Sequence, residues 1–250
     1  MFMVLKRKRK REYYREFKIV RGVFDERTLL VLYRLLNRKK ITVESLVKEG
    51  KESVILSGLT KDKEWVAIKV YRTEACDFKT MWKYLVGDHR FPRITKKRRI
   101  IVNLWCQREF KNLKIAHEAN VNSPKPLFFD ENILIMSFIG EDGVVAPRLI
   151  DIIPDNSKEL YKLVLKNLKD LVKADLVHGD LSAYNILLLD EPYFIDFSHG
   201  TNMKSPLALE LLKRDIKNIN SYFSKLNIAV KGSKKIYKEL NQNLKEKVNK

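Results

Sequence analysis

Cysteine is scarce in this sequence, and so are the patterns that bind zinc or form disulfides. The 250 residues include only two cysteines, Cys76 and Cys106, with no Cys-x-x-Cys pair. Their number and spacing suggest neither a disulfide framework nor a zinc site, and they fit a reducing compartment.

Long apolar runs are missing as well. No stretch approaches the roughly 18 consecutive apolar residues that a membrane span needs. The apolar start, residues 1–5, is shorter than the hydrophobic part of a signal peptide and is followed by charged residues. We therefore expect a soluble, cytoplasmic protein.

Acidic residues are outnumbered by basic ones. The chain has 50 Lys and Arg against 31 Asp and Glu, a formal net charge of +19. Composition alone fits either a Lys-rich, heat-adapted surface or a polyanionic partner. The cations cluster at residues 6–11, 96–99 and 231–250. This clustering favours RNA or a ribonucleoprotein as the partner.

The periodicity of apolar residues predicts a sheet-rich first half and a helical second half. Asp25 can cap a helix that runs through Asn37. Residues 73–97 are too irregular for a confident helix, and we expect a mobile loop there. The other predicted elements are strands over 41–47, 53–57 and 65–71, a helix over 98–117, strands over 127–129 and 133–137, and helices over 157–173 and 206–226.

This order predicts an α+β fold with two lobes. A hinge near Gly140 would separate a sheet-rich N-lobe, residues 23–139, from a mainly helical C-lobe, residues 140–250, that ends in a basic helix. Residues 1–22 would be a basic N-terminal extension.

The stretch from 176 to 196, LVHGDLSAYNILLLDEPYFID, carries the chemistry. Residues 186–189 and 193–195 have the pattern of two short strands joined by a turn. This hairpin places Asn185 at the start of one strand and Asp196 at the end of the other. An amide oxygen and a carboxylate that converge in this way predict a Mg²⁺ site, with phosphate and water completing the shell.

Asp180 lies five residues before Asn185, close enough for a loop to hold its carboxylate beside the metal. Phosphoryl transfer requires mainly positioning and charge neutralisation, so an Asp that orients the attacking hydroxyl is a sufficient base. We interpret Asp180 as the catalytic base and His178 as a brace for the loop.

Two residues of the first half complete this pattern. Lys69 is a cation on the otherwise apolar strand 65–71, where burial calls for an anionic partner. Glu109 falls on the apolar stripe of the predicted helix 98–117, where a carboxylate needs a cation. We therefore expect Lys69 and Glu109 to form an ion pair near ATP phosphates.

At these residues the sequence resembles the RIO kinases, and specifically their Rio-one subfamily, from about residue 23 to residue 218. Ordinary protein kinases carry Arg where Gly179 stands and Lys where Ser182 stands. The segment Gly50-Lys51-Glu52-Ser53 resembles the family's compact nucleotide loop. The subfamily resemblance rests on residues 23–33, 78–91 and 141–147.

The resemblance implies a bilobal protein-kinase-like fold trimmed of the activation segment and of the substrate-docking helices. It implies ATP as the cofactor, with Mg²⁺ or alternatively Mn²⁺. It also implies that Asp196, a metal ligand, accepts a phosphoryl group transiently. The enzyme would then be an atypical serine/threonine kinase and ATPase that acts in small-ribosomal-subunit maturation, with the pre-ribosomal small subunit and its rRNA as partners. The nucleotide-binding residues that follow from it are Lys51, Ser53 and Lys69 near the phosphates, Glu109 beside Lys69, the backbone of Ser137 and Ile139 at adenine, Met136 at the back of the pocket, and Pro147.

Some residues depart from the family pattern. Ser137 stands where Glu is usual, and His199 stands where Gln is usual. No activation segment ending in Ala-Pro-Glu follows Asp196, so a peptide-docking platform is not evident. Two alternatives stay open: a nucleotide-gated ribosome-assembly factor with incidental turnover, and a small-molecule or tRNA-modification kinase.

Overall fold

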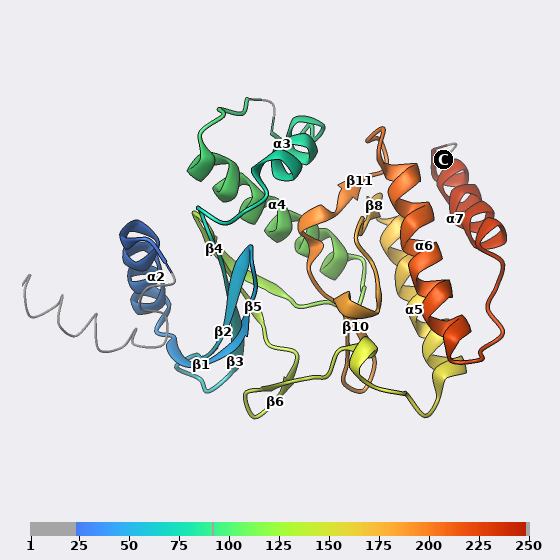
Figure 1. The fold of residues 1–250 in the computed structure, drawn as a ribbon, viewed down its shortest axis with the longest axis horizontal. Helices are drawn as coiled ribbons and strands as arrows, with labels where there is room; N and C mark the ends of the chain where they lie inside the picture. The colour runs from blue at the N-terminus through green and yellow to red at the C-terminus, as the bar shows by residue number, and fades with distance from the viewer. Residues whose placement is uncertain (1–23, 92, 249–250) are drawn as a thin grey trace, which may run out of the picture.

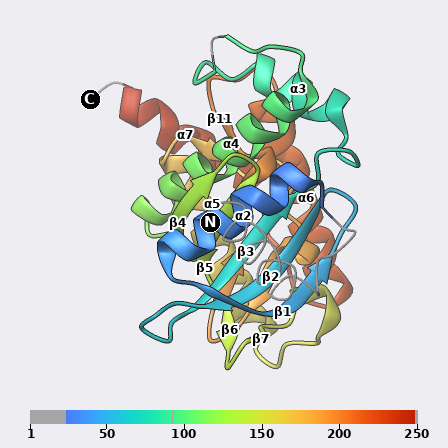
Figure 2. The same ribbon diagram turned by 90° about the vertical axis from the view of Figure 1, so that its left-hand side faces the viewer.

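The first half of the molecule is a five-stranded antiparallel sheet with helices on both faces (Figures 1 and 2). The computed structural model describes residues 24–91 and 93–248. The basic run at 6–11 and the predicted extension 1–22 lie outside these residues. In the order β1-β2-β3-β5-β4, the strands are β1 (Thr42–Glu49), β2 (Ser53–Leu59), β3 (Trp65–Tyr71), β5 (Ile133–Ser137) and β4 (Pro126–Asp130).

Helix α2 (Glu26–Lys39) covers one face of the sheet. Its N-cap is Asp25, whose carboxylate accepts a hydrogen bond from the backbone N–H of Thr28, as the sequence predicts. The apolar face of α2 packs against Val66, Ile68 and Val70 of β3. Because side chains alternate along a strand, the intervening residues face the other way, toward helix α4 (Arg98–Glu118). Lys69 is one of these.

The region expected to be a loop contains a helix, α3 (Phe78–Val86). Asp77 caps it by accepting hydrogen bonds from the N–H groups of Lys79 and Thr80. Only Met81 and Leu85 of this nine-residue helix are buried. A helix of this length needs tertiary support, and α3 has it because it packs against α4.

The second half begins with a small hairpin, β6 (Gly140–Glu141) and β7 (Val144–Val145). Gly143 at its turn has φ +79° and lies so close to the Trp65 ring that a Cβ would clash. The remaining elements are η2 (Leu149–Asp151), α5 (Ser157–Lys173), β8 (Leu176–Val177), η3 (Ala183–Asn185), β9 (Ile186–Leu188), β10 (Pro192–Phe194), η4 (Phe197–His199), β11 (Thr201–Asn202), α6 (Ala208–Lys225) and α7 (Ser233–Val248).

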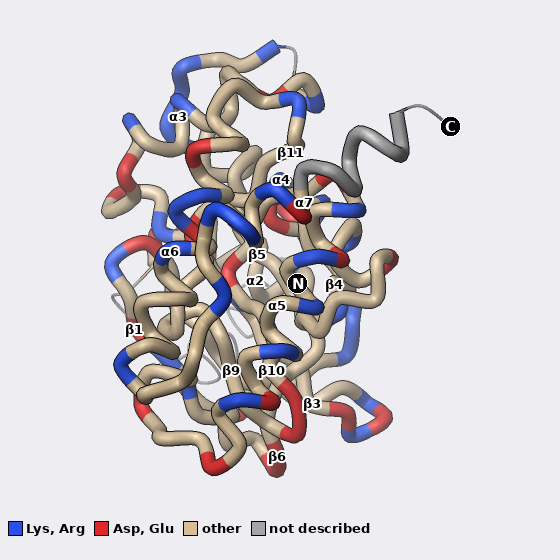
Figure 3. Tube along the Cα trace, turned by 90° about the vertical axis from the view of Figure 1, so that its right-hand side faces the viewer, with Lys and Arg blue, Asp and Glu red and all other residues tan. Residues whose placement is uncertain are grey.

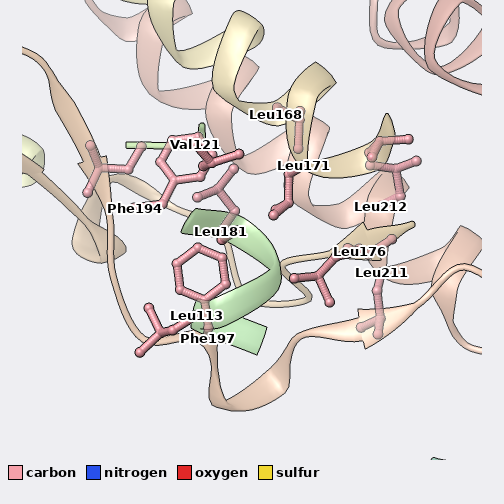
Figure 4. Close-up of a cluster of buried hydrophobic side chains, with 14 of the residues drawn as sticks. Leu113, Val121, Leu168, Leu171, Leu176, Leu181, Phe194, Phe197, Leu211 and Leu212 are labelled. Carbon is pink, nitrogen blue, oxygen red and sulfur yellow. The ribbon is translucent and has the colours of Figure 1, made fainter. Parts of the chain in front are cut away.

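One large hydrophobic core joins the two halves. It includes the α4-facing side chains of β3 and β5, the buried face of α4, and residues of α5, α6 and α7. Figure 4 shows Leu113 of α4 beside Phe197 in this core, to which leucines of α5 and α6 also belong. Among the described residues, no helix is both long and apolar enough to cross a membrane. The fold is α+β, with a sheet-rich N-terminal part and a helical C-terminal part, as predicted.

Candidate active site

A cavity of about 540 Å³ lies between the sheet and the β9–β10 hairpin, a size within the range of small-molecule sites. Most of the predicted site residues line it: Ser53, Lys69, Glu109, Met136, Ser137, Ile139, Pro147, Asn185 and Asp196. Two do not. Lys51 is exposed in the β1–β2 turn and does not line the cavity. Asp180 does not line it either, but it is hydrogen-bonded to Asn185, which does.

Lys69 is held between two carboxylates at the inner end of the cavity. Its Nζ lies 2.8 Å from Glu109 Oε1 and 3.0 Å from Asp196 Oδ1. Strand β3 supplies Lys69, α4 supplies Glu109, and the segment after β10 supplies Asp196. The predicted Lys69–Glu109 pair is confirmed as a structural contact. Tyr71, which the sequence pattern did not single out, donates a hydrogen bond to the second oxygen of Glu109.

This arrangement determines the protonation states of Lys69 and Asp196. Burial alone would lower the pKa of Lys69, but the charges of Asp196 and Glu109 raise it instead, so the amine stays protonated. Burial would raise the pKa of Asp196, but Lys69 and a 2.8 Å hydrogen bond from Ser198 hold it well below its usual range. Asp196 is therefore ionised at neutral pH. Burial raises the pKa of Glu109 despite its pairing with Lys69.

The loop before β9 brings Asp180 to Asn185. The side-chain amide of Asn185 donates to the carbonyl oxygen of Asp180 at 2.8 Å and to its carboxylate at 3.0 Å. Partial burial of the carboxylate and the negative charge of Asp196 raise the pKa of Asp180, although the residue as a whole is exposed. These features suit a group that accepts a proton.

His178 is a structural brace, as predicted. It is fully buried, and its Nε2 donates to the carbonyl of Ile195 at 3.0 Å. Burial lowers the pKa of His178 to about 4, so the ring is neutral at physiological pH. The hydrogen bond ties the loop before Asp180 to the residue before Asp196.

Helix α6 holds the backbone on both sides of Asp180. Asp215 accepts hydrogen bonds from the backbone N–H groups of Gly179 (2.8 Å) and Leu181 (2.9 Å), and Asn218 donates to the carbonyl of Leu181. Burial raises the pKa of Asp215 to about 7. Sequence reasoning missed Asp215. Its signal was an acidic residue on the apolar stripe of α6, the same signal that identified Glu109 on α4.

The two departures from the family pattern have structural explanations. Ser137 turns its hydroxyl to the backbone N–H of Lys125 at 2.8 Å and thus braces the end of β5. The His199 ring packs edge-on between Tyr84 and Trp105, with centroids 5.2 and 5.3 Å away.

Comparison with known proteins identifies the family. The RIO domain family model matches residues 54–236. The RIO-type serine/threonine-protein kinase Rio1 of Methanocaldococcus jannaschii is 42% identical over 223 residues, which cover 88% of this chain and 76% of that protein. The chain belongs to the RIO family. The human serine/threonine-protein kinase RIO1 is 34% identical, over 84% of this chain and 38% of the human protein.

The structural neighbours of this RIO kinase share its fold. A crystal structure of Rio2 kinase from Chaetomium thermophilum, described as an ADP/Mg²⁺-phosphoaspartate complex, superposes with a TM-score of 0.70 at 23% identity. The match covers 86% of this chain and 65% of that one. The bilobal protein-kinase-like architecture is confirmed. The Rio1 relatives of archaea and eukaryotes are named serine/threonine-protein kinases, which supports kinase activity for this chain.

The residues present fit a magnesium ion. The Nδ2 of Asn185 is turned to Asp180, which directs its amide oxygen away from that residue, and Asp196 offers an ionised carboxylate in the same cavity. The described part of the chain has no cluster of three or more His, Cys, Asp or Glu able to hold a metal by themselves. Two oxygen ligands are nonetheless what Mg²⁺ needs when phosphate and water supply the rest.

Proposed function

We propose that this RIO kinase is a Mg²⁺-dependent ATP phosphotransferase and ATPase, with Asp180 as base and Asp196 as metal ligand and phosphoryl acceptor. The observation that carries the proposal is the Asp196 carboxylate, which is ionised, lies in the cavity and is held 3.0 Å from Lys69 Nζ. Asn185 and Asp196 would bind Mg²⁺, which neutralises charge on the phosphate oxygens. The Rio2 complex described with ADP, Mg²⁺ and phosphoaspartate supports the same chemistry here.

The site residues would take part in two reactions, an ATPase reaction and a kinase reaction. In the ATPase reaction, an oxygen of Asp196 attacks the γ-phosphorus, the bond to the β,γ-bridging oxygen breaks, and ADP leaves. Water then hydrolyses the acyl phosphate. In the kinase reaction, Asp180 takes the proton of a serine or threonine hydroxyl while that oxygen bonds to the γ-phosphorus, the bond to the β,γ-bridging oxygen breaks, and ADP leaves. Lys69 orients the phosphates in both reactions.

The nucleotide fits the cavity with adenine at the β5 end. The carbonyl of Ile139 is bonded to the N–H of Ala146 at 3.0 Å, and the N–H of Ser137 is bonded to Lys125. The backbone N–H of Ile139 is thus the donor that we assign to adenine. Ser53 and Lys69 would then lie on the phosphate side, and Met136 would close the back of the pocket.

Radiolabelled ATP tests this proposal. Incubation with γ-labelled Mg-ATP should leave label on the wild-type chain that hydroxylamine removes, because an acyl phosphate is labile to this nucleophile and phosphoserine is not. Asp196→Asn should abolish that label. If Asp196→Asn carried the same hydroxylamine-sensitive label, the assignment of Asp196 as acceptor would be wrong.

We further propose that the chain binds the RNA of small-ribosomal-subunit precursors. Exposed cations surround α3 and the start of α4, where Figure 3 shows Lys and Arg concentrated near the α3 label. They are Lys79, Lys83, Arg93, Lys96, Lys97 and Arg98. Phosphate contacts release counterions, so affinity for small-subunit RNA should fall steeply with salt. A gel-shift series in which binding was absent or insensitive to salt would contradict this.

One observation favours a second candidate, a nucleotide-gated assembly factor. Only residues 200–207 separate η4 from α6, too few for a peptide-docking segment at that place. In this case nucleotide binding rather than turnover would drive release from the particle. Equal particle release by wild type and Asp196→Ala would support it over the enzymatic role.

A further inference from the structure

A buried ionic network contacts residues 196–200, which include the proposed metal ligand Asp196 and which we call the metal-binding segment. Its centre is Arg108, next in sequence to Glu109 and completely buried. Its Nε donates to Asp88 Oδ2 at 3.1 Å, and its Nη1 donates to the carbonyl of Ser198 at 3.4 Å. One helix therefore contacts the active site through two successive residues.

Asp88 serves two guanidinium groups. Besides Arg108, it accepts from Nε of Arg90 at 2.8 Å and from Nη2 of Arg90 at 2.6 Å. Arg90 then reaches the Oδ1 of Asn112 at 2.9 Å. Asp88 and Arg90 follow α3, in the stretch where sequence analysis expected a loop.

Asn112 completes the connection to the metal-binding segment. It is fully buried, and its Nδ2 donates to the carbonyls of Phe197 and Gly200, both at 2.8 Å. Arg90 holds the amide oxygen, so the amide cannot flip without losing three hydrogen bonds. A Cβ at Gly200 would lie 2.8 Å from Asn112 Nδ2. Glycine at this position permits the close approach.

The network acts on a segment with a strained start. Asp196 has φ +63°, in the left-handed region that non-glycine residues rarely adopt. The three carbonyls that the network holds, those of Phe197, Ser198 and Gly200, follow it directly. Holding both ends of a four-residue turn fixes the backbone at its start, and with it the direction of the Asp196 side chain.

We propose that Asp88, Arg90, Arg108 and Asn112, which we call the rear clamp, position Asp196 for metal binding and tie the stretch after α3 to the active site. This rests on the proposed function, because it assumes that Asp196 binds the metal. The members of the rear clamp are positioning residues, since Asp88, Arg90, Arg108 and Asn112 do not line the cavity. Burying two cations around one carboxylate is a costly way to hold a helix, which apolar packing would do as well.

The substitution Asn112→Asp tests the rear clamp with little change of shape. It keeps an acceptor for Arg90 and removes both donors to the segment. The readout is Mn²⁺ binding followed by electron paramagnetic resonance, with a non-hydrolysable ATP analogue present. We expect a Mn²⁺ dissociation constant about 10- to 100-fold higher than wild type, the range typical of lost outer contacts to metal ligands. Binding of the analogue without metal should stay close to wild type.

Two further variants keep the test decisive. Asn220→Asp is the matched control, because Asn220 is also a buried helical asparagine whose amide donates to a carbonyl, that of Lys231 at 2.8 Å, but it lies outside the site. Its Mn²⁺ affinity should match wild type. Arg90→Lys keeps the charge and loses the fork that bridges Asp88 and Asn112, so it should weaken Mn²⁺ binding even if Asn112→Asp fails to fold.

The outcomes separate the rear clamp from the enzymatic proposal. Unchanged Mn²⁺ affinity in Arg90→Lys and in any folded Asn112→Asp would overturn the clamp, as would an equal loss in Asn220→Asp. Loss of Mn²⁺ affinity in the two clamp variants would support it even if the wild type failed to turn over ATP. In that case only the proposed catalytic function would fall.

Discussion

Lys69 illustrates how one side chain serves both stability and chemistry. Its amine is nearly inaccessible to solvent, and Glu109, on α4, is 1% exposed. Removing one partner of a buried ion pair leaves an uncompensated charge, whereas replacing both with apolar groups is often tolerated. The two roles are therefore separable by mutation.

We expect Lys69→Met to lower the free energy of unfolding by about 3 kcal/mol, because Glu109 loses its cation. The double variant Lys69→Met with Glu109→Leu should recover part of that loss. Neither variant should transfer phosphate, because both lack the Lys69 amine beside Asp196. Urea denaturation and labelled-ATP assays would measure both effects. Recovery of transfer in the double variant would contradict the role given to Lys69.

His178 makes stability depend on pH in a defined direction. Its pKa is lowered to about 4 in the folded chain, against about 6.5 in an unfolded one. As pH falls from 6.5 toward 4, the unfolded state binds a proton that the folded state does not, so stability is lost. Between pH 6.5 and 4.5 the loss from this group should be on the order of 2 kcal/mol.

The variant His178→Asn should lack this pH-dependent loss of stability, although we expect it to be less stable than wild type at pH 7. Free energies of unfolding measured for both chains from pH 4.5 to 7.5 give the comparison. Parallel curves for the two chains would show that His178 does not carry the dependence.

At the scale of elements, helix α2 depends on its first turn. Asp25 caps the helix, accepts a hydrogen bond from Thr73 Oγ1 at 2.8 Å and forms an ion pair with Arg99. Although burial opposes it, the hydrogen bonds with Thr28 and Thr73 lower the pKa of Asp25 to about 2. The cap thus joins α2 to the sheet and to α4.

Asp25→Ala should therefore lower the free energy of unfolding by about 2 kcal/mol, the upper part of the range for a lost N-cap. Asp77→Ala is the matched control, since Asp77 caps α3 through local hydrogen bonds alone and is exposed. Its effect on global stability should be smaller. Chemical denaturation of the two variants decides this, and the reverse order would be evidence against the joining role of Asp25.

Elements that repeat an apolar period could be predicted from sequence, and so could a contact between two such elements where each buries a charge of opposite sign, but contacts of side chains with distant backbone groups could not. Strand β3 and helix α4 have long apolar patterns, so the positions of Lys69 and Glu109 and their pairing followed from local reasoning. Helix α3 has local signals, an Asp77 N-cap and Gly87 at its C-cap, but it is only nine residues long and sequence reasoning missed it. Asn112 and Asp215 act on backbone groups 85 to 88 and 34 to 36 residues away, which no sequence period encodes.

At the scale of the molecule, the continuous core makes α4 a shared part of both halves. Trp105, Leu113 and Ala116 of α4 belong to one buried cluster with Met136 of the sheet and Phe223 of α6. Separating the halves would expose this apolar surface, at roughly 25 cal/mol per Å². The halves should therefore not unfold independently.

We expect urea unfolding to give coincident transitions by tryptophan fluorescence and by far-ultraviolet circular dichroism. The fluorescence reports on Trp65 in the sheet, Trp82 in α3 and Trp105 in α4, whereas the dichroism is dominated by the helices of both halves. Two separated midpoints would mean that the core is not shared in the way that the structure indicates.

The position of β1 at the edge of the sheet bears on how product leaves. Among the described strands, β1 pairs with β2 alone, is mostly exposed and has two register shifts, and together with Gly50 and Glu52 it forms one wall of the cavity. The opposite wall, with Leu187 and Ile195, adjoins the shared core. If ATP is turned over as proposed, we expect ADP to leave on the side of β1, because this wall is less well supported than the wall that adjoins the core, and the two halves need not separate.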